Sequence, residues 1–360
     1  MRVLSALLCF LLACSSERTR TDGSTDTDGG SDSGADASAD PCACLPGPHT
    51  ENIFVISADG EIWRFNPRTL DFTFVVGPVC AGQTPFSMGV DAEGVAWINI
   101  IDSLAVLNLD LLAPSACTDS TYQRRNPEFG LFGMSFATRS ATDVCADLFV
   151  MTYSGDGSFD EGPDLGRLGV IDPVGGALTP LASNNFDGGE LTGTGDGRLF
   201  GFAGVAPVKL IEFDRETGGT LREIPLDGVR KTNSSAVAFF GGDIYLFTEA
   251  TAPECSTCLD AECGAALDAC EDDAVCSEHL DCVLATPMFS DECGGGLSEE
   301  MVRCLDRCEA CTRGSVARTS RVLRYDLDES DGGGLSEPVE EAPIRIVGAA
   351  SSPCVPVGPI

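Results

Sequence analysis

The segment ELTGTGDGRLFGF, residues 190–202, contains the pattern that decides the fold. An apolar run reaches a tight turn at Asp196-Gly197, and a second apolar run follows, with Phe200 three positions after the glycine. Glycine readily adopts the positive φ of two-residue hairpin turns, so the segment predicts two antiparallel strands. The same arrangement occurs at Glu93-Gly94 with Trp97 and at Gly241-Gly242 with Tyr245. We interpret these aromatic residues as packing between repeated units, with a ligand platform as the alternative.

A second repeated feature gives the period. Five times an apolar strand ends in a hydrophobic residue followed by Asn or Asp: Phe65-Asn66, Leu107-Asn108, Ile171-Asp172, Phe213-Asp214 and Tyr325-Asp326. Two intervals are 42 residues, and the other two, 64 and 112, exceed this length by insertions. A period near 42 with about four strands per unit is typical of propeller blades. The sequence therefore predicts an all-β, five-bladed β-propeller over residues 52–250 and 321–360.

The two ends of this region indicate how the ring closes. The first unit has only three strands of its own, expected at 52–57, 61–65 and 71–76. Both Cys80 and Cys354 follow similar Val-Gly segments, and each precedes a candidate innermost strand. We therefore expect Val355 to Ile360, the C-terminal strand, to complete blade one, which would remove exposed sheet edges.

The longest interval contains a segment of different character, residues 251–320, between the second and third strands of blade five. Its Ala, Leu, Glu and Asp residues recur at helical spacing. The pairs Cys255/Cys258 and Cys308/Cys311 have zinc-knuckle spacing, but in an exported chain disulfides are the preferred interpretation. We expect a helical module stapled by five disulfides among Cys255, Cys258, Cys263, Cys270, Cys276, Cys282, Cys293, Cys304, Cys308 and Cys311.

Six further cysteines lie outside this insertion. Alignment of the repeats places Cys80 and Cys354 in equivalent blade connections, so we expect them to form a disulfide. Cys117 and Cys145 are the second expected pair. Cys42 and Cys44 receive no assignment.

The N-terminus predicts an exported lipoprotein. Residues 1–14 combine Arg2, an apolar stretch and Leu11-Leu12-Ala13-Cys14, which resembles the bacterial lipobox. The resemblance implies that the Cys14 thiol is diacylated, with palmitate-type chains, and that this lipid anchors the protein in a membrane. It further implies that the membrane is the outer membrane of a Gram-negative bacterium. An ordinary cleaved signal peptide is the alternative. Residues 15–51 are rich in Ser, Thr, Asp and Gly, which predicts a disordered acidic tether.

Charge excludes several classes of function. With 22 Lys plus Arg against 56 Asp plus Glu, the net charge is -34, so a nucleic-acid partner is excluded. The two histidines, His49 and His279, disfavour a Ser-His-Asp mechanism. The sequence contains no cofactor fingerprint, and we expect no cofactor.

Two sets of acidic residues are weak candidates for chemistry. Glu128 and Glu190 precede or open inner strands, where a glycosidase would need a carboxylate pair, but solvated loop acids are the preferred interpretation. The loop from 155 to 164 has oxygen donors that suggest calcium, although Glu161 stands where the helix-loop-helix motif requires Gly. Its candidate ligands are Asp156, Ser158, Asp160 and Asp164.

Several segments resemble a group of uncharacterised myxobacterial-type propeller lipoproteins. The similar stretches are residues 85–91 (PFSMGVD), 190–202 and 346–349 (IVGA), within 52–250 and 318–356. The resemblance implies no catalytic residue. We expect a binding or scaffold propeller, whose insertion and acidic loop share one face that binds an envelope protein, a glycan or a divalent cation; a glycan-active hydrolase is the alternative.

Overall fold

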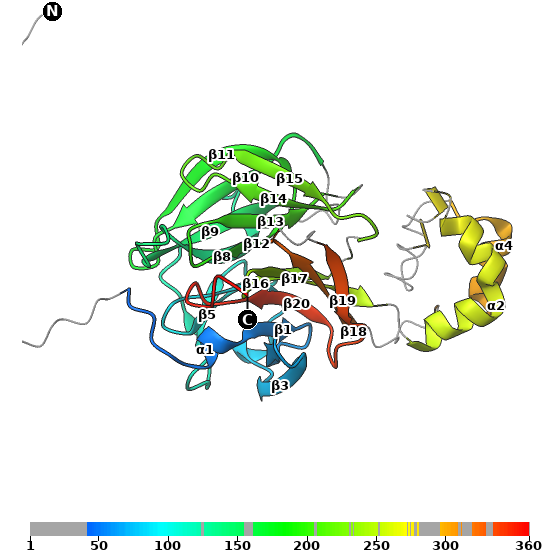
Figure 1. The fold of residues 1–360 in the computed structure, drawn as a ribbon, viewed down its shortest axis with the longest axis horizontal. Helices are drawn as coiled ribbons and strands as arrows, with labels where there is room; N and C mark the ends of the chain where they lie inside the picture. The colour runs from blue at the N-terminus through cyan, green and yellow to red at the C-terminus, as the bar shows by residue number, and fades with distance from the viewer. Residues whose placement is uncertain are drawn as a thin grey trace, which may run out of the picture. The chain divides into compact units, whose positions relative to one another are not determined.

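The computed structural model contains five four-stranded antiparallel sheets in its described part, and this confirms the five-bladed propeller (Figure 1). The chain divides into two units, residues 1–39 and residues 40–360, and the propeller belongs to the second. The structure describes residues 42–123, 126–154, 161–204, 207–229, 232, 234–250, 253–271, 273, 275–276, 279–280, 296–308, 311, 319–328 and 334–359.

Each sheet is one blade, and its four strands follow one another from the central channel outwards. Blade 1 contains β20 (Ile346–Ala350), β1 (Ile53–Ser57), β2 (Ile62–Asn66) and β3 (Asp71–Val76). Blade 2 contains β4 (Pro85–Val90), β5 (Val95–Ile100), β6 (Val106–Asp110) and β7 (Thr118–Asp119). Blade 3 contains β8 (Leu131–Thr138), β9 (Ala146–Tyr153), β10 (Glu161–Ile171) and β11 (Leu178–Phe186).

The last two blades follow the same order. Blade 4 contains β12 (Glu190–Gly193), β13 (Leu199–Ala203), β14 (Lys209–Phe213) and β15 (Thr220–Pro225). Blade 5 contains β16 (Ser235–Phe240), β17 (Asp243–Ala250), β18 (Thr319–Asp326) and β19 (Leu335–Val339). Burial falls outwards, from fully buried β16 to the largely exposed outer strand β15, because only the inner strands are enclosed by neighbouring blades.

A C-terminal strand closes the ring, as expected, but it is formed by other residues than those we predicted. The inner strand of blade 1 is β20, which pairs antiparallel with β1 through Phe54 opposite Ala350 and Val55 opposite Ala349. The choice of Val355 to Ile360 is wrong, since residues 351–359 contain no strand. Prolines recur in this tail at positions 353, 356 and 359, and proline cannot donate the backbone hydrogen bonds of an inner strand.

Aromatic residues pack between blades, as we interpreted them from the sequence. Tyr245 of blade 5 lies edge-on to Phe65 of blade 1, with ring centroids 5.8 Å apart. Trp97 of blade 2 meets Phe136 of blade 3 in the same geometry at 5.9 Å. Such pairs add about 0.5–1.5 kcal/mol to the effect of burial, so they help to fix neighbouring blades.

The folded body begins before the expected boundary at residue 52. Residues 42–51 were expected to belong to the tether, but they include a short helix, α1 (Pro48–Glu51), and two disulfide-bonded cysteines. His49 on this helix is 1% exposed. We call residues 42–51 the N-terminal strap.

The propeller disulfides differ from the expected pairs. The structure joins Cys42 to Cys145, Cys44 to Cys354, and Cys80 to Cys117, so the expected pairs Cys80–Cys354 and Cys117–Cys145 are wrong. The repeat alignment failed because it gave the two strap cysteines no place. Because the strap packs on the propeller, its cysteines form the disulfides with Cys145 and Cys354.

The insertion contains two helices joined by a ladder of disulfides. Helix α2 (Pro253–Glu271) and helix α4 (Glu299–Arg307) are linked by Cys255–Cys311, Cys258–Cys308 and Cys263–Cys304. The partner numbers fall as the first numbers rise, so the two segments run antiparallel. A fourth bond joins Cys270 to Cys276, while Cys282 and Cys293 lie outside the described residues. The sulfur atoms of both zinc-like pairs are therefore in disulfides between segments.

Ser298 caps α4, because its side chain accepts a hydrogen bond from the Met301 amide at 3.1 Å.

Within the described residues, no helix is both long enough and apolar enough to cross a bilayer.

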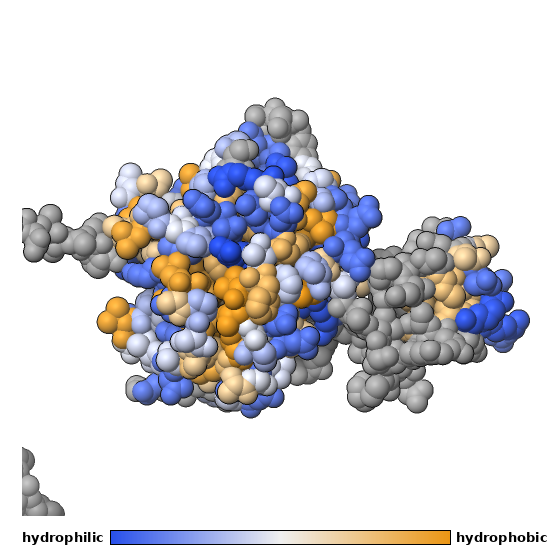
Figure 2. Space-filling model, turned by 90° about the horizontal axis from the view of Figure 1, so that it is seen from below, coloured by the Kyte–Doolittle hydropathy of each residue, from blue (hydrophilic) through white to orange (hydrophobic). Residues whose placement is uncertain are grey.

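Apolar residues also remain on the surface. Figure 2, a view of the molecule from below Figure 1, shows them gathered near the middle of the propeller among hydrophilic neighbours. The exposed apolar side chains of the propeller include Phe74 on the outer strand β3, at 49% exposure, and Leu112, at 51%.

Candidate functional site

The two ends of the propeller channel provide different surroundings for a site. We call the end at which the inner strands begin the upper face, and the end at which they finish the lower face. Connections from β9 to β10 and from β17 to β18 leave the upper face, because both join the second strand of a blade to the third. The hairpin turns at Asp91–Gly94 and Gly241–Gly242, the N-terminal strap and residues 351–359 lie at the lower face.

Small polar side chains close the channel between these faces. The Ser135 hydroxyl accepts a hydrogen bond from the Gly193 amide at 2.9 Å, and Thr192 accepts one from the Phe239 amide at 2.8 Å. These bonds join blade 3 to blade 4 and blade 4 to blade 5. A Cβ atom added to Gly133 would lie 2.0 Å from the Gly189 carbonyl oxygen, so the backbones meet directly. The inner strands therefore form a packed core.

Glu190 lies inside this packing. It is 9% exposed, and its Oε2 accepts a hydrogen bond from the Ser87 hydroxyl at 2.7 Å. Ser87 is on β4 of blade 2 and Glu190 is on β12 of blade 4, so the bond connects two blades that are not neighbours. The Ser87 hydroxyl also accepts from the Met134 amide at 3.2 Å, on the blade between them. This carboxylate thus links three inner strands.

Glu128 has a different setting at the upper face. It precedes β8, is exposed, and its Oε1 lies 3.3 Å from Arg167 Nε. It lines a cavity of about 360 Å³ together with Tyr153 and Asp187. Glu190 is not among the described residues that line this cavity, so the cavity does not combine the two expected carboxylates.

Polar groups around this cavity form hydrogen bonds with one another. The Ser154 hydroxyl donates to Asp187 Oδ2 at 2.5 Å, and the Ser154 amide donates to Oδ1 at 2.9 Å. The Tyr153 ring stacks on Phe86, with centroids 5.4 Å apart. These contacts hold the rim of the cavity in place.

Of the candidate calcium ligands, only Asp164 can be placed. Asp156, Ser158 and Asp160 lie outside the described residues. Asp164 has a positive φ of 58°, and its Oδ1 accepts a hydrogen bond from Ser183 at 2.5 Å. Within the described residues, no group of three metal-ligating side chains comes together.

The lower face has the larger cavity, of about 640 Å³, between blades 4, 5 and 1. Four turns and the chain end surround it. Its lining residues are Pro67, Arg68, Thr194, Asp196, Arg198, Phe239, Gly241, Gly242, Asp243, Tyr245, Arg324, Asp326, Leu327, Asp328, Val357 and Pro359.

Strand register explains why charged groups gather here. Asp243 and Tyr245 are two residues apart on β17, and their partners on β18 are Asp326 and Arg324. Side chains alternate along a strand, so these four side chains point to one side of blade 5. The Arg324 guanidinium donates to Asp243 at 2.7 Å, and this pair forms one wall of the cavity.

Two other groups at this cavity are without polar partners. The Tyr245 side chain is 2% exposed, and its hydroxyl makes no hydrogen bond within the described part of the chain. Burial raises the pKa of Tyr245 to about 12, with the nearby Asp243 acting in the same direction, so the hydroxyl remains a donor. Arg68 lies over the Phe240 ring at 5.6 Å and forms no ion pair with any described carboxylate.

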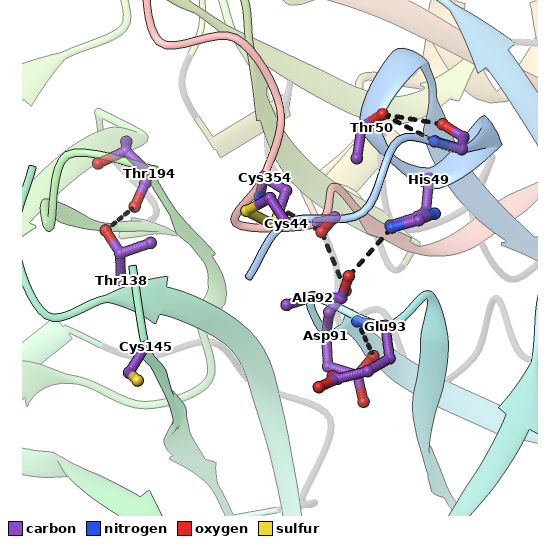
Figure 3. Close-up of a disulfide and its surroundings, with 12 residues drawn as sticks. Cys44, His49, Thr50, Asp91, Ala92, Glu93, Thr138, Cys145, Thr194 and Cys354 are labelled. Atoms are coloured by element: carbon purple, nitrogen blue, oxygen red, sulfur yellow. Dashed lines mark hydrogen bonds between the residues drawn. A yellow bond between two sulfur atoms is a disulfide. The ribbon is translucent and has the colours of Figure 1, made fainter. Parts of the chain in front are cut away.

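The N-terminal strap occupies another part of the lower face (Figure 3). His49 points towards Ala92, with Nε2 3.0 Å from the carbonyl oxygen, and burial lowers the pKa of its imidazole. Burial also raises the pKa of the neighbouring Asp91 to about 6. The Asp91 carbonyl accepts a hydrogen bond from the Ser352 hydroxyl at 2.9 Å, so the strap and the C-terminal tail both contact this hairpin.

Sequence reasoning found two features of the lower cavity without recognising the cavity itself. Tyr245 was identified by its place after the Gly241–Gly242 turn. The repeated strand ends at Asn66 and Asp326 mark the two turns that contribute Arg68 and Asp328. A repeat shows that such turns share a face, but it does not show which two turns leave space between them.

Comparisons with known proteins leave the family open. No protein-family model matches the chain, and no curated protein matches it. Virginiamycin B lyase from Staphylococcus aureus, bound to quinupristin, is 14% identical over 56% of this chain and 64% of its own, with a TM-score of 0.32. Kuenenia stuttgartiensis hydrazine synthase is 12% identical over 82% of this chain and 68% of its own, with a TM-score of 0.37. The Dos1 propeller is 8% identical over 56% of this chain and 51% of its own, with a TM-score of 0.35.

Proposed function

We propose that this chain is a lipid-anchored, extracytoplasmic propeller that binds a partner and does not transform it. One observation carries the proposal: the two candidate catalytic carboxylates are engaged by different groups, and among the described residues Glu190 does not line the cavity that Glu128 lines. Glu190 accepts the Ser87 hydrogen bond within the closed channel, and Glu128 pairs with Arg167 at the surface. A glycosidase needs two carboxyl groups facing one substrate, so this arrangement favours binding.

The proposed location rests on the cysteines. Disulfides persist in oxidising compartments, and both the propeller and the insertion contain them. This chemistry agrees with export through the signal at residues 1–14, with Cys14 as the proposed lipid site and the outer membrane as the proposed destination.

The proposed partner surface is the upper face. The insertion of residues 251–318 and the 154–161 connection both leave this face and interrupt the repeat. Non-repeated connections on a rigid scaffold commonly carry recognition, and in this chain both are acidic. We propose that an envelope protein docks here.

The test compares three proteins on an envelope fraction: the intact chain, a variant with residues 251–318 replaced by a short Gly-Ser turn, and Glu190→Gln. Chemical cross-linking followed by mass spectrometry should recover a defined envelope protein with the intact chain and with Glu190→Gln, but not with the shortened chain. Release of reducing ends measures glycan hydrolysis and should stay at background for all three. A hydrolytic activity that Glu190→Gln abolishes would replace this function with the enzyme, and equal cross-linking by the shortened chain would also overturn it.

A further inference from the structure

The 640 Å³ cavity at the lower face has the size and donor pattern of a ligand site, although no motif marks it. Ligand pockets commonly measure about 300–1,000 Å³ and contain a few convergent polar groups. This cavity is formed by blades 4, 5 and 1 and by the C-terminal tail, of which Val357 and Pro359 form one side. It lies at the end of the channel opposite the β17–β18 connection that carries the insertion, so it is a separate site from the proposed partner surface.

The tail is held in a fixed position beside this cavity. The Gly241 amide donates to the Pro356 carbonyl at 2.9 Å. A Cβ atom at Gly195 would lie 2.8 Å from the Pro353 carbonyl oxygen and 2.9 Å from Val357, so glycine is needed for the tail to pass. Cys354 ties the same segment to the strap. The cavity wall is therefore anchored by a hydrogen bond, close packing and a disulfide.

The Tyr245 hydroxyl is the strongest indication of a ligand. The residue is 2% exposed, and its hydroxyl makes no hydrogen bond to a described residue but is not sealed from solvent, so it is open to a partner from the cavity. This hydroxyl belongs to a side chain that lines the cavity, beside Asp243 and Arg324. A polar ligand atom in the cavity could accept a hydrogen bond from this hydroxyl.

The charges that surround this hydroxyl determine which ligand would fit. Arg324 is paired with Asp243, and Arg198 makes two hydrogen bonds to Glu212, at 2.8 and 3.0 Å. Arg68 is left as a donor without an ion pair to any described residue. Asp196 accepts a hydrogen bond from the Thr194 hydroxyl and Asp326 accepts one from the Asp328 amide, but neither carboxylate forms an ion pair with a described residue.

A ligand must then supply acceptors for Arg68 and Tyr245 and donors for the aspartates. A cationic ligand would be repelled by Arg68, and an anionic ligand would be repelled by the carboxylates. A ligand with a net charge of either sign is therefore disfavoured by one part of the cavity lining. Closely spaced hydroxyl groups both donate and accept, and they carry no charge. We propose that this cavity binds a neutral saccharide.

The test uses saturation-transfer NMR on the full chain with three probes at millimolar concentration: maltose, cellobiose and N,N′-diacetylchitobiose. At least one should give signals, and Tyr245→Phe should raise its dissociation constant by about 3–10-fold through loss of one hydrogen bond. Arg68→Gln should weaken it similarly. The matched controls are Tyr122→Phe, which removes a hydroxyl that donates to the Phe129 carbonyl instead, and Arg303→Gln on α4; both should bind as the intact chain does.

Spermidine and inorganic phosphate provide the two opposite charge classes. The proposal is overturned if no disaccharide gives a signal, if only spermidine or phosphate binds, or if the Tyr245 and Arg68 variants bind the disaccharide as tightly as the controls. Circular dichroism of each variant confirms that the propeller is intact, so loss of binding is not mistaken for loss of fold.

Discussion

Cys44 and Cys354 are 310 residues apart in sequence, yet a disulfide holds their Cα atoms 5.5 Å apart (Figure 3). Cys44 precedes β1, and Cys354 follows β20. Because β1 and β20 are the antiparallel pair that closes the ring, the bond reinforces covalently the same closure that their hydrogen bonds make. The disulfide thus joins the two ends of the propeller chain at the lower face.

Removing this bond should destabilise the propeller without changing its insertion. We expect Cys44→Ser with Cys354→Ser to lower the free energy of unfolding by about 2–4 kcal/mol, because the unfolded chain regains freedom over a long loop. Denaturant unfolding monitored by tryptophan fluorescence measures this, since Trp63 and Trp97 both lie in the propeller. The control is Cys270→Ser with Cys276→Ser in the insertion, which should leave the transition unchanged; an equal loss in both would contradict the closure role.

Truncation separates the closing strand from the tail. Deleting residues 357–360 removes part of the lower cavity wall but leaves β20 intact, so the melting temperature should change little. Deleting residues 346–360 removes the inner strand of blade 1 and exposes β1, and we expect loss of the cooperative transition in calorimetry. A chain without β20 that melts as the intact chain does would contradict ring closure.

The repeat predicted the blades well because its signals are local. The hairpin turn, the aromatic residue three positions later and the strand-ending Asn or Asp each depend on neighbouring residues, and they recur wherever a blade does. The strands of blade 1 expected at 52–57, 61–65 and 71–76 correspond to β1, β2 and β3 within one residue at each end.

The errors concern relationships between distant parts of the chain. Choosing between Ile346–Ala350 and Val355 to Ile360 required weighing the prolines of the tail, and the disulfides depended on how the strap lies across the propeller. Cys42 and Cys44 carry no periodic signal, so the repeat could not assign them. Likewise, the lower cavity depends on the space between blades, which spacing along one chain does not specify.

The contact between Ser87 and Glu190 predicts a stability effect. Ser87→Ala would remove the hydroxyl that donates to Glu190 and accepts from the Met134 amide, leaving two buried groups with fewer partners. We expect unfolding to become easier by about 1–3 kcal/mol. Chemical denaturation measures the change, with Ser103→Ala as the control, because the Ser103 bond to Gln83 is exposed. Equal stability of the two variants would show that the channel bond contributes nothing.

Asp91 makes the stability of the fold depend on pH. Burial raises its pKa from 3.8 to about 6, so the folded state binds this proton more tightly than the unfolded state does. Stability from this group should therefore increase as pH falls through about 6 and stop increasing below about 3.8, by about 3 kcal/mol in total.

Asp91→Asn provides the test of this dependence. The variant lacks the titrating carboxyl, so the stabilising rise on acidification should disappear when the free energy of unfolding is measured between pH 7 and 4. His49 acts in the opposite direction, because its lowered pKa makes the folded state lose stability as pH falls below about 6.5. A pH profile identical in Asp91→Asn and in the intact chain would contradict the assignment.

Glycine at position 133 is required by the closeness of the inner strands. Gly133 is on β8, and an added Cβ atom would lie 2.0 Å from the Gly189 carbonyl oxygen, immediately before β12. Neither partner is a flexible side chain, so Gly133→Ala must push blades 3 and 4 apart at the channel. We expect a loss of at least about 1–3 kcal/mol, which is typical of overpacking.

The matched control for this substitution is Gly264→Ala on helix α2, where an added Cβ meets nothing within 4 Å and alanine favours the helix. Calorimetry should therefore show a lower melting temperature for the channel variant alone. If Gly133→Ala melted at the same temperature as Gly264→Ala, the inner strands would have room to separate. The channel could then admit a ligand, and Glu190 would no longer be confined to a packed core.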